Sequence, residues 1–315
     1  MRISLPEPIA DDRVLLDAFQ AYLTRRDLAP ATVRVYLHDL KVFQDWLAWV
    51  YETPAVSLGQ VGTADLATFR KHLLHERAQR ATTINRRLQS LRLFYHWLTQ
   101  HRRARENPAE HLRFLREGRR PQPAVLKRSE VLALLRAANA SPHGMAKRNV
   151  ALVQLLLQTG LRVSEVAALK QEDVKLGART GQVTVRAGKG LKFRQLPLNA
   201  TARRALQNYL ETQIELKPQR PLFLSKRQTS LSVRAIQNVI AELARRAEID
   251  RIPVSAHTLR HTFAASYLKT NPGKLIELSG LLGHESLDTT AIYARPSQDD
   301  LALDLERSPL NVLGD

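Results

Sequence analysis

Cysteine is absent from this 315-residue sequence, which excludes disulfides and thiolate metal sites. Long apolar runs are absent too, because the most apolar stretch, residues 150–161, is interrupted by Gln154 and Gln158 and is too short to cross a bilayer. The first dozen residues carry prolines and acidic residues where a signal peptide has an apolar run. We therefore expect a protein of the cytoplasm without a membrane partner.

Acidic residues are scarce relative to basic ones. The chain has 48 Lys and Arg against 30 Asp and Glu, which gives a formal net charge of +18. The excess is spread over the chain, with 20 basic and 13 acidic residues in 1–120 and 28 and 17 in 121–315. Such a surplus favours a polyanionic partner, since phosphates attract basic side chains through counterion release. A merely basic soluble protein is the alternative from charge alone.

The pattern of apolar residues predicts a mainly α fold with one small antiparallel sheet. We expect a helical N-terminal domain over 1–116, a basic proline-containing linker over 117–126, a second domain over 127–296 and a C-terminal tail over 297–315. Ser129 is expected to cap the first helix of the second domain, and Asn107-Pro108 to start a short helical piece. The expected helices cover residues 13–26, 30–50, 63–79, 82–98, 129–139, 145–159, 200–213, 232–247, 257–270, 273–282 and 286–293, and the expected strands cover 182–187 and 192–198.

Polar and basic side chains gather on one face of the helix that begins at Thr82 or Thr83. Side chains of Arg, Asn and Gln on an outward helix face pair with guanine and adenine edges in the major groove. An ordinary solvated face is the open alternative. The candidate DNA-binding residues are Asn85, Arg86, Arg87, Gln89 and Arg92, with Thr32 and Arg34 on the second helix and Arg119 and Arg120 in the linker.

Chemically capable residues concentrate in the stretch from His257 to Tyr293. It contains His257 three residues before Arg260, His284 in a Leu-Gly-His sequence, and Tyr293 nine residues later. Two further candidates precede it, which are Arg162 just after Gly160 and Lys189 in a Gly-Lys-Gly turn. Guanidinium groups hold the non-bridging oxygens of a phosphodiester through paired N–H donors. Taken singly, each arginine could equally be a surface residue, and Lys189 a solvated turn lysine.

These motifs resemble the tyrosine recombinase, or lambda-integrase-like, family. The sequences TGLRVSE, HTLRHTFA and LLGH, the hairpin Lys189 and Tyr293 occur in the family's order with similar spacings. The N-terminal half, with Thr32, Tyr36 and TTINRRLQSLRLFYHWL, resembles the family's SAM-like core-binding domain. Length and compactness are most similar to Xer proteins and the short integrases of mobile elements.

The resemblance implies a role for each motif residue and requires neither cofactor nor metal. Tyr293 would attack the phosphodiester and form a 3′-phosphotyrosyl link, while Arg162 and Arg260 hold the phosphate. We assign proton abstraction from Tyr293 to His257 and phosphate hydrogen bonding to His284. Lys189 would protonate the leaving 5′-oxygen. The supporting residue Glu165 would pair with Arg162 or with a nearby histidine, and His261 is expected to point elsewhere as a structural histidine.

The sequence therefore predicts a site-specific enzyme for DNA strand exchange. The expected partners are double-stranded DNA with paired inverted half-sites, a homotetramer on two sites, and an accessory or partner recombinase in some settings. The biological role stays open among integration, excision, transposition and Xer-type dimer resolution. Two rivals are a type IB topoisomerase and a non-catalytic DNA-binding regulator. The amphipathic tail carrying Leu301, Leu303 and Leu305 is expected to dock on a neighbouring protomer or to pack in cis.

Overall fold

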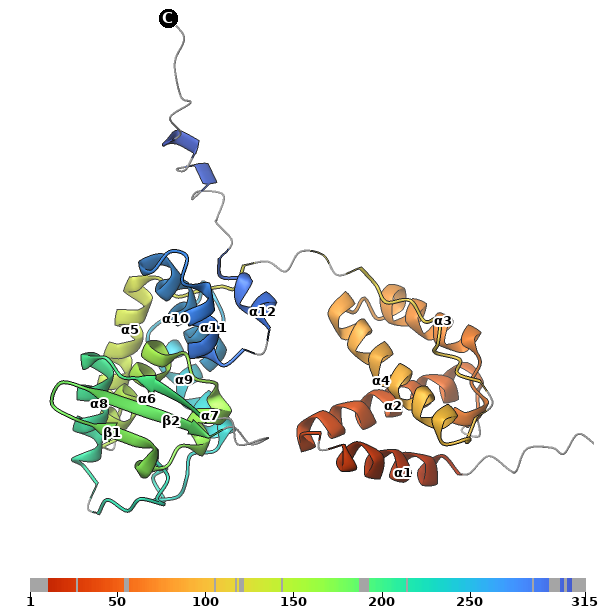
Figure 1. Ribbon diagram of the computed structural model, residues 1–315, viewed down its shortest axis with the longest axis horizontal. Coiled ribbons are helices and arrows are strands. Elements are labelled where there is room, and N and C mark those ends of the chain that lie inside the picture. Colours follow the sequence, from red (N-terminus) through yellow and green to blue (C-terminus); the bar gives the residue numbers. More distant parts are fainter. Residues whose placement is uncertain are drawn as a thin grey trace, which may run out of the picture. The chain divides into compact units, whose positions relative to one another are not determined.

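Figure 1 shows a computed structural model in which the chain divides into two compact units, residues 1–120 and 121–315. The division falls inside the segment predicted to be a linker. The structure describes residues 11–26, 28–53, 57–104, 106–116, 118, 122–142, 144–186, 193–213, 215–284, 286–294, 301–302 and 305–307. Arg119, Arg120, Lys189 and Leu303 therefore lie outside the described residues.

The first unit is helical over the part that the structure describes, as its sequence predicts. The third helix ends earlier than expected, because α3 stops at Lys71 and continues as a π-helical turn, η2. Residues 108–111 form turns in place of the helical piece expected after Asn107. The elements are α1 (Asp12–Arg25), α2 (Pro30–Val50), η1 (Leu58–Gln60), α3 (Thr63–Lys71), η2 (His72–Glu76) and α4 (Ala81–Gln100).

Aromatic side chains fill the core of this unit. Phe19 of α1 meets Phe94 of α4 edge-on, with ring centroids 5.1 Å apart. Phe43 of α2 and Phe69 of α3 lie 4.8 Å apart by the same measure. All four are fully buried. Since such rings bury large apolar areas, the four helices are held by one core of their own.

The second unit surrounds helix α6, which is buried along most of its length and packs against α5, α8 and α10. Its first helix begins one residue before Ser129, because Glu130 reaches back to the Lys127 N–H, so the prediction of a Ser129 cap is wrong. The elements are α5 (Arg128–Asn139), α6 (Ala146–Thr159), α7 (Val163–Ala168), η3 (Gln171–Asp173), β1 (Val174–Leu176), β2 (Gly181–Arg186), β3 (Phe193–Pro197), α8 (Ala200–Leu210), α9 (Val233–Arg246), α10 (Ala256–Thr270), α11 (Leu275–Leu282) and α12 (Leu287–Ala291).

The sheet has three antiparallel strands in the order β1-β2-β3. Strand β1 was not predicted, since three residues are too few to show an alternating pattern. Val183 pairs with Leu196, and both are buried. Arg194 pairs with Val185 and shares the inward face of β3 with Leu196. The mainly α fold with a small antiparallel sheet is confirmed.

Gly160 ends α6 in the left-handed region, with φ +63°. A Cβ here would lie 2.4 Å from Cδ1 of Phe263 and 2.8 Å from Cδ2 of Leu282. The position therefore requires glycine twice, for its backbone angle and for the close approach of α10 and α11. No helix among the described residues is both long and apolar enough to cross a membrane.

Replacing Gly160 with Ala should destabilise the second unit by about 2–5 kcal/mol, through a strained left-handed residue and an overpacked contact. The matched control is Gly280→Ala, because Gly280 lies in α11 and a Cβ added there would meet nothing within 4 Å. That change should stabilise by about 0.5–1 kcal/mol. Urea unfolding followed by far-UV circular dichroism measures both. Equal effects at the two glycines would contradict the interpretation.

Candidate active site

Two of the predicted catalytic arginines converge on the turn that ends α11. Arg260 Nη2 donates to the carbonyl of Leu282 at 2.9 Å, and Arg162 Nη2 donates to the carbonyl of Gly283 at 2.9 Å. The last carbonyls of a helix have no partner within the helix and carry partial negative charge. The carbonyls at this end of α11 therefore accept hydrogen bonds from guanidinium groups.

Arg260 projects from α10, whose N-terminus is capped by Ser255. The residue is only 3% exposed, and its Nη1 also donates to the carbonyl of Gly160 at 2.6 Å. Burial, and next the neighbouring Arg162, lower the pKa of the Arg260 guanidinium to about 10. It therefore stays charged at neutral pH, fixed between the ends of α6 and α11.

Arg162 stands at the N-terminus of α7, where Glu165 completes a capping arrangement. One oxygen of Glu165 accepts from the Arg162 backbone N–H at 2.7 Å, and the other accepts from Arg162 Nη1 at 3.1 Å. Burial opposes ionisation of Glu165, but hydrogen bonds from Arg194 and from this backbone N–H outweigh it and lower the pKa of the carboxyl. The Arg162 side chain is 43% exposed and so accessible to a ligand.

His284, which is predicted to hydrogen-bond to the phosphate, has other partners in the structure. Its Nε2 lies 2.7 Å from Arg260 Nη2, and because arginine only donates, this nitrogen accepts. Its Nδ1 lies 2.7 Å from Oγ1 of the buried Thr290. Burial, and then Arg260 and Arg162, lower the pKa of the imidazole to about 4. In this structure His284 orients Arg260 and has no N–H left for a phosphate.

His261, and not His257, lies against the phenol of Tyr293. Nδ1 of His261 is 2.5 Å from the Tyr293 hydroxyl. The expectation that His261 points elsewhere is therefore wrong. His257 and His261 are four residues apart on α10, a spacing that puts both on one helix face. Their rings meet edge to face with centroids 4.1 Å apart, so His261 links His257 to Tyr293.

Burial, together with neighbouring charges, keeps this group of side chains neutral. Burial, and then His257 and Arg260, lower the pKa of His261 to about 4. Burial and the same arginine also lower the pKa of His257. Burial raises the pKa of Tyr293, although Arg260 opposes the shift. A neutral imidazole beside a neutral phenol can accept the proton of the phenol.

The structure thus brings together five of the six predicted catalytic residues, and Lys189 falls outside the described part. Arg162, Arg260 and His284 share the α11 turn, while His257 and Tyr293 are joined through His261. Arg194 was missed, although an arginine on the inward face of a strand is a signal that alternation could have found. Among the described residues, no cluster of His, Asp or Glu could hold a metal ion.

The predicted DNA-reading helix α4 is less open than its sequence indicates. The Asn85 amide exchanges two hydrogen bonds with the backbone of Leu115. Arg86 donates to the fully buried Asp39, and Arg87 Nε lies 3.8 Å from the same carboxylate. These three side chains brace the first unit in this structure.

The remaining candidates divide into engaged and accessible side chains. Arg92 donates to the carbonyls of Glu110 and Leu112 and stacks over Phe114, 4.8 Å from the ring centroid. Gln89 and Arg34 are exposed, and Thr32 is half-buried. Among the candidates that the structure describes, these last three are therefore accessible without the loss of a hydrogen bond or ion pair that the structure gives.

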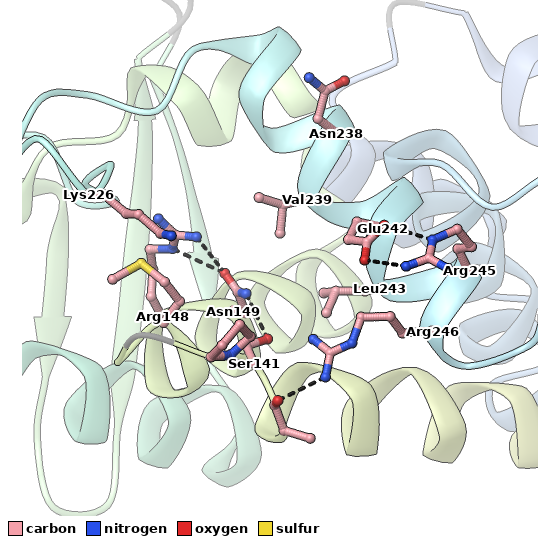
Figure 2. Close-up of a pocket in the computed structure, with 13 residues that line it drawn as sticks. Ser141, Arg148, Asn149, Lys226, Asn238, Val239, Glu242, Leu243, Arg245 and Arg246 are labelled. Carbon is pink, nitrogen blue, oxygen red and sulfur yellow. Dashed lines mark hydrogen bonds and ion pairs between the residues drawn. The ribbon is translucent and has the colours of Figure 1, made fainter.

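A hollow of about 620 Å³ between α5, α6 and α9 is separate from the site (Figure 2). Its buried Arg148 donates to Asn149 and to the carbonyl of Leu224. At its rim, Arg245 pairs with Glu242 through two hydrogen bonds. None of the predicted catalytic residues lines it, and its arginines are engaged within the protein.

Comparisons with known proteins identify the family of this chain. Residues 124–299 match the phage integrase family, and residues 16–102 match the phage integrase N-terminal SAM-like domain. Tyrosine recombinase XerC of Halalkalibacterium halodurans is 33% identical over 297 residues, covering 91% of this chain and 94% of the relative. Tyrosine recombinase XerD of Ralstonia nicotianae is 31% identical over 305 residues, covering 95% and 94%.

Solved structures share the architecture. The crystal structure of XerA recombinase covers 95% of this chain and 99% of that chain, with 26% identity and a TM-score of 0.51. The XerH site-specific recombinase bound to palindromic difH substrate, in a post-cleavage complex, has 19% identity and a TM-score of 0.74 over 96% and 98% of the two chains, which shows the common fold.

The family match and these relatives identify an enzyme of a class that breaks and rejoins DNA. The chain belongs to the phage integrase family of tyrosine recombinases, with Xer recombinases among its relatives.

Lowering the pH should destabilise the second unit through His261 and His284. Unfolded imidazoles bind protons near pH ~6.5, whereas burial lowers the pKa of both folded rings to about 4. Between these values the unfolded state binds more protons, so stability falls as the pH drops from 6.5 toward 4. Both rings are half-buried, so screening leaves about 1 kcal/mol each.

Urea unfolding at pH 7, 5.5 and 4.5 measures this effect. All three tryptophans lie in residues 1–120, so their fluorescence reports the first unit, and far-UV circular dichroism adds the second. The double variant His261→Gln with His284→Gln should flatten the pH dependence of the second transition. Replacement of the exposed His96 of α4 with Gln, in the first unit, should not. A double variant with the wild-type slope would refute the assignment.

Proposed function

We propose that this protein is a site-specific recombinase that cuts and rejoins double-stranded DNA through a 3′-phosphotyrosyl intermediate. The observation that carries the proposal is the convergence of Arg162, Arg260 and His284 on the α11 turn, with Tyr293 held next to them by His261. Two fixed cations beside a phenol form a site for attack on an anionic phosphodiester without a metal.

Arg162 and Arg260 stabilise the negative charge that develops on the phosphate. Cleavage of a phosphodiester concentrates negative charge on the non-bridging oxygens, and guanidinium groups match them with paired donors. Arg260 is held rigidly by carbonyls on two sides, whereas Arg162 is partly exposed. Preorganised donors of this kind need little rearrangement as the charge develops.

Proton transfer falls to the histidines and to Lys189. The Tyr293 oxygen forms a new bond to phosphorus as its proton leaves toward His257, directly or through His261. The bond from phosphorus to the 5′-oxygen breaks, and that oxygen takes a proton from Lys189. The phosphotyrosyl link keeps the energy of the broken bond, so an incoming 5′-hydroxyl can reverse the step without a cofactor.

Strand exchange needs more than one active site. We propose paired inverted half-sites on the DNA and four copies of this chain on two duplexes, acting in the cytoplasm on nucleoid or element DNA. An accessory protein or a second recombinase fits the same scheme. Integration, excision, transposition and dimer resolution use identical chemistry, and the choice among them depends on the DNA sites.

DNA reading is shared between two kinds of side chain. Thr32, Arg34 and Gln89 are proposed to contact DNA directly, because each is at least partly accessible. Asn85, Arg86, Arg87 and Arg92 support the helices that present them, unless DNA competes for their partners. The linker residues Arg119 and Arg120 are proposed to follow the phosphate backbone.

A type IB topoisomerase would use the same phosphotyrosyl chemistry on one duplex, and a regulator would bind without cleavage. The similarity to tyrosine recombinases over more than nine-tenths of the chain favours the recombinase. Joining of two separate duplexes would separate recombinase from topoisomerase.

A nicked suicide substrate that carries the protein's site tests the chemistry. Wild type should form a protein–DNA adduct that survives denaturation, because loss of the short strand beyond the nick prevents religation. Tyr293→Phe should abolish the adduct and leave DNA affinity within about threefold, since only the phenolic oxygen is removed. Denaturing gels with labelled DNA measure both.

The matched control is Tyr267→Phe, a half-buried tyrosine of α10 that packs beside Phe263. It should retain the adduct. A wild type without an adduct would overturn both enzymatic functions, and an adduct in Tyr293→Phe would overturn the choice of nucleophile.

The C-terminal tail is proposed to coordinate protomers. Leu301 and Leu305 are exposed on its described residues, and the tail begins four residues after Tyr293. Deleting residues 297–315 should therefore lower cleavage or recombination more than DNA affinity, because the deletion frees the segment that carries the nucleophile. Gel shifts and adduct yields on one substrate measure the two effects. Unchanged cleavage and recombination would refute the link.

A further inference from the structure

Three arginines, and not two, hold the turn that ends α11. The carbonyls of Leu281, Leu282 and Gly283 accept hydrogen bonds from Arg194, Arg260 and Arg162 in that order, at 3.2, 2.9 and 2.9 Å. Three consecutive carbonyls are thereby assigned to three separate elements, β3, α10 and α7. The third arginine has no role in the chemistry proposed above.

Arg194 has the most complete set of partners among the three. Its Nη1 and Nη2 each lie 2.8 Å from one oxygen of Glu165, a paired contact between planar groups. Its Nε donates to Leu281. The side chain is 19% exposed, so little of it faces solvent. Because each of its nitrogens already donates within the protein, Arg194 is poorly placed to bind a phosphate.

Glu165 passes this restraint on to Arg162. The oxygen that accepts from Arg194 Nη1 also accepts from Arg162 Nη1, and the other oxygen accepts from the Arg162 backbone N–H. A carboxylate held on one side by a paired arginine has a fixed plane. Both the main chain and the guanidinium of Arg162 are therefore oriented through Glu165.

Gly283 makes room for the third arginine. A Cβ at this position would lie 2.8 Å from Arg194 Nη1 and 2.9 Å from Cζ. The residue also has φ +63°, as the left-handed end of α11 requires. The glycine of the Leu-Gly-His motif thus serves the chain reversal and the approach of Arg194 together.

We infer that Arg194 is a positioning residue, which fixes Arg162 through Glu165 and fixes the turn that holds Arg260 and His284. This inference rests on the proposed function, since it concerns the geometry of the same site. Arg194 lies five residues after Lys189 at the start of β3, so the strand that follows the predicted proton donor is tied to the same turn.

The variant Arg194→Lys tests the inference, because lysine keeps the charge and loses the paired contact. Single-turnover cleavage of the suicide substrate at saturating DNA should slow by about 10- to 100-fold, as expected for a small displacement of aligned groups. The dissociation constant for DNA should stay within about threefold. This split between rate and affinity distinguishes positioning from phosphate binding.

The matched control is Arg251→Lys. Arg251 also makes a paired contact, with Glu130 at 2.9 and 2.7 Å, and also donates to a backbone carbonyl, that of Val125. It lies in the same unit and contacts none of the predicted catalytic residues. Its replacement should leave the cleavage rate within about twofold of wild type, even if both variants lose similar stability.

A second readout needs no DNA. Burial, and then the charges of Arg260, Arg162 and Arg194, lower the pKa of His284. Arg194→Lys leaves the local charge unchanged, so a change in this pKa would report a change in the packing of the turn. If the turn loosens, the His284 pKa should rise from its value of about 4 toward that of a free imidazole. Titration by NMR measures the shift, and Arg251→Lys should show none.

A double-variant cycle completes the test. In a protein that already carries Arg162→Lys, adding Arg194→Lys should slow cleavage by less than about a further threefold, since Arg194 acts partly through Arg162. Wild-type cleavage by Arg194→Lys, or an unmoved His284 pKa, would overturn the inference. A wild type without any adduct would instead overturn the proposed function, and the His284 titration would still decide the role of Arg194.

Discussion

The site depends on the carbonyls at the end of α11 that have no hydrogen-bond partner within the helix. A helix terminus leaves its last carbonyls without partners inside the helix, and here arginines from β3, α7 and α10 take them. The arrangement of the arginines thus follows from the need of these backbone carbonyls for hydrogen-bond donors. Leu282 anchors the turn in the core, and Gly283 reverses the chain within reach of Arg194.

Gly160, at the end of α6, also offers a helix-end carbonyl to an arginine of the site. Its carbonyl ends α6 and accepts from Arg260, so this arginine joins two helix termini. The lack of a side chain lets Phe263 and Leu282 close over the position. Stability and catalysis therefore share residues here, and a change that loosens the packing also moves the guanidinium.

Much of this could be predicted from the sequence, and the reasons for the failures are physical. Helix positions followed from apolar periodicity, and Gly160 was recognisable as a helix end. Five motif residues were predicted from their types and order, and the structure groups them around the α11 turn and Tyr293. His261 was assigned wrongly although its spacing of four from His257 puts both on one face. Arg194 carries no motif, and its meaning depends on the fold that brings Glu165 opposite it.

The partners of the predicted DNA-binding residues on α4 could not be read from the sequence. The positions of these residues along the helix were right, but a sequence does not reveal that Asp39 of α2 is buried against Arg86 and Arg87. A buried carboxylate needs a cation beside it, and here basic side chains that the sequence suggests for DNA binding supply the charge. Outward polarity on a helix therefore predicts a binding face only once the neighbouring elements are known.

The low proton affinity of the histidines follows first from burial and then from the neighbouring charged groups. Burial and the arginines hold His257, His261 and His284 neutral, and Tyr293 stays a phenol. A phosphate bound between Arg162 and Arg260 would bring negative charge to this group and raise the proton affinity of each imidazole. The substrate would then supply the charge that makes its own proton acceptor stronger. Such a site is a weak base when empty and a better one when DNA is bound, which links activation of the nucleophile to occupancy of the arginines.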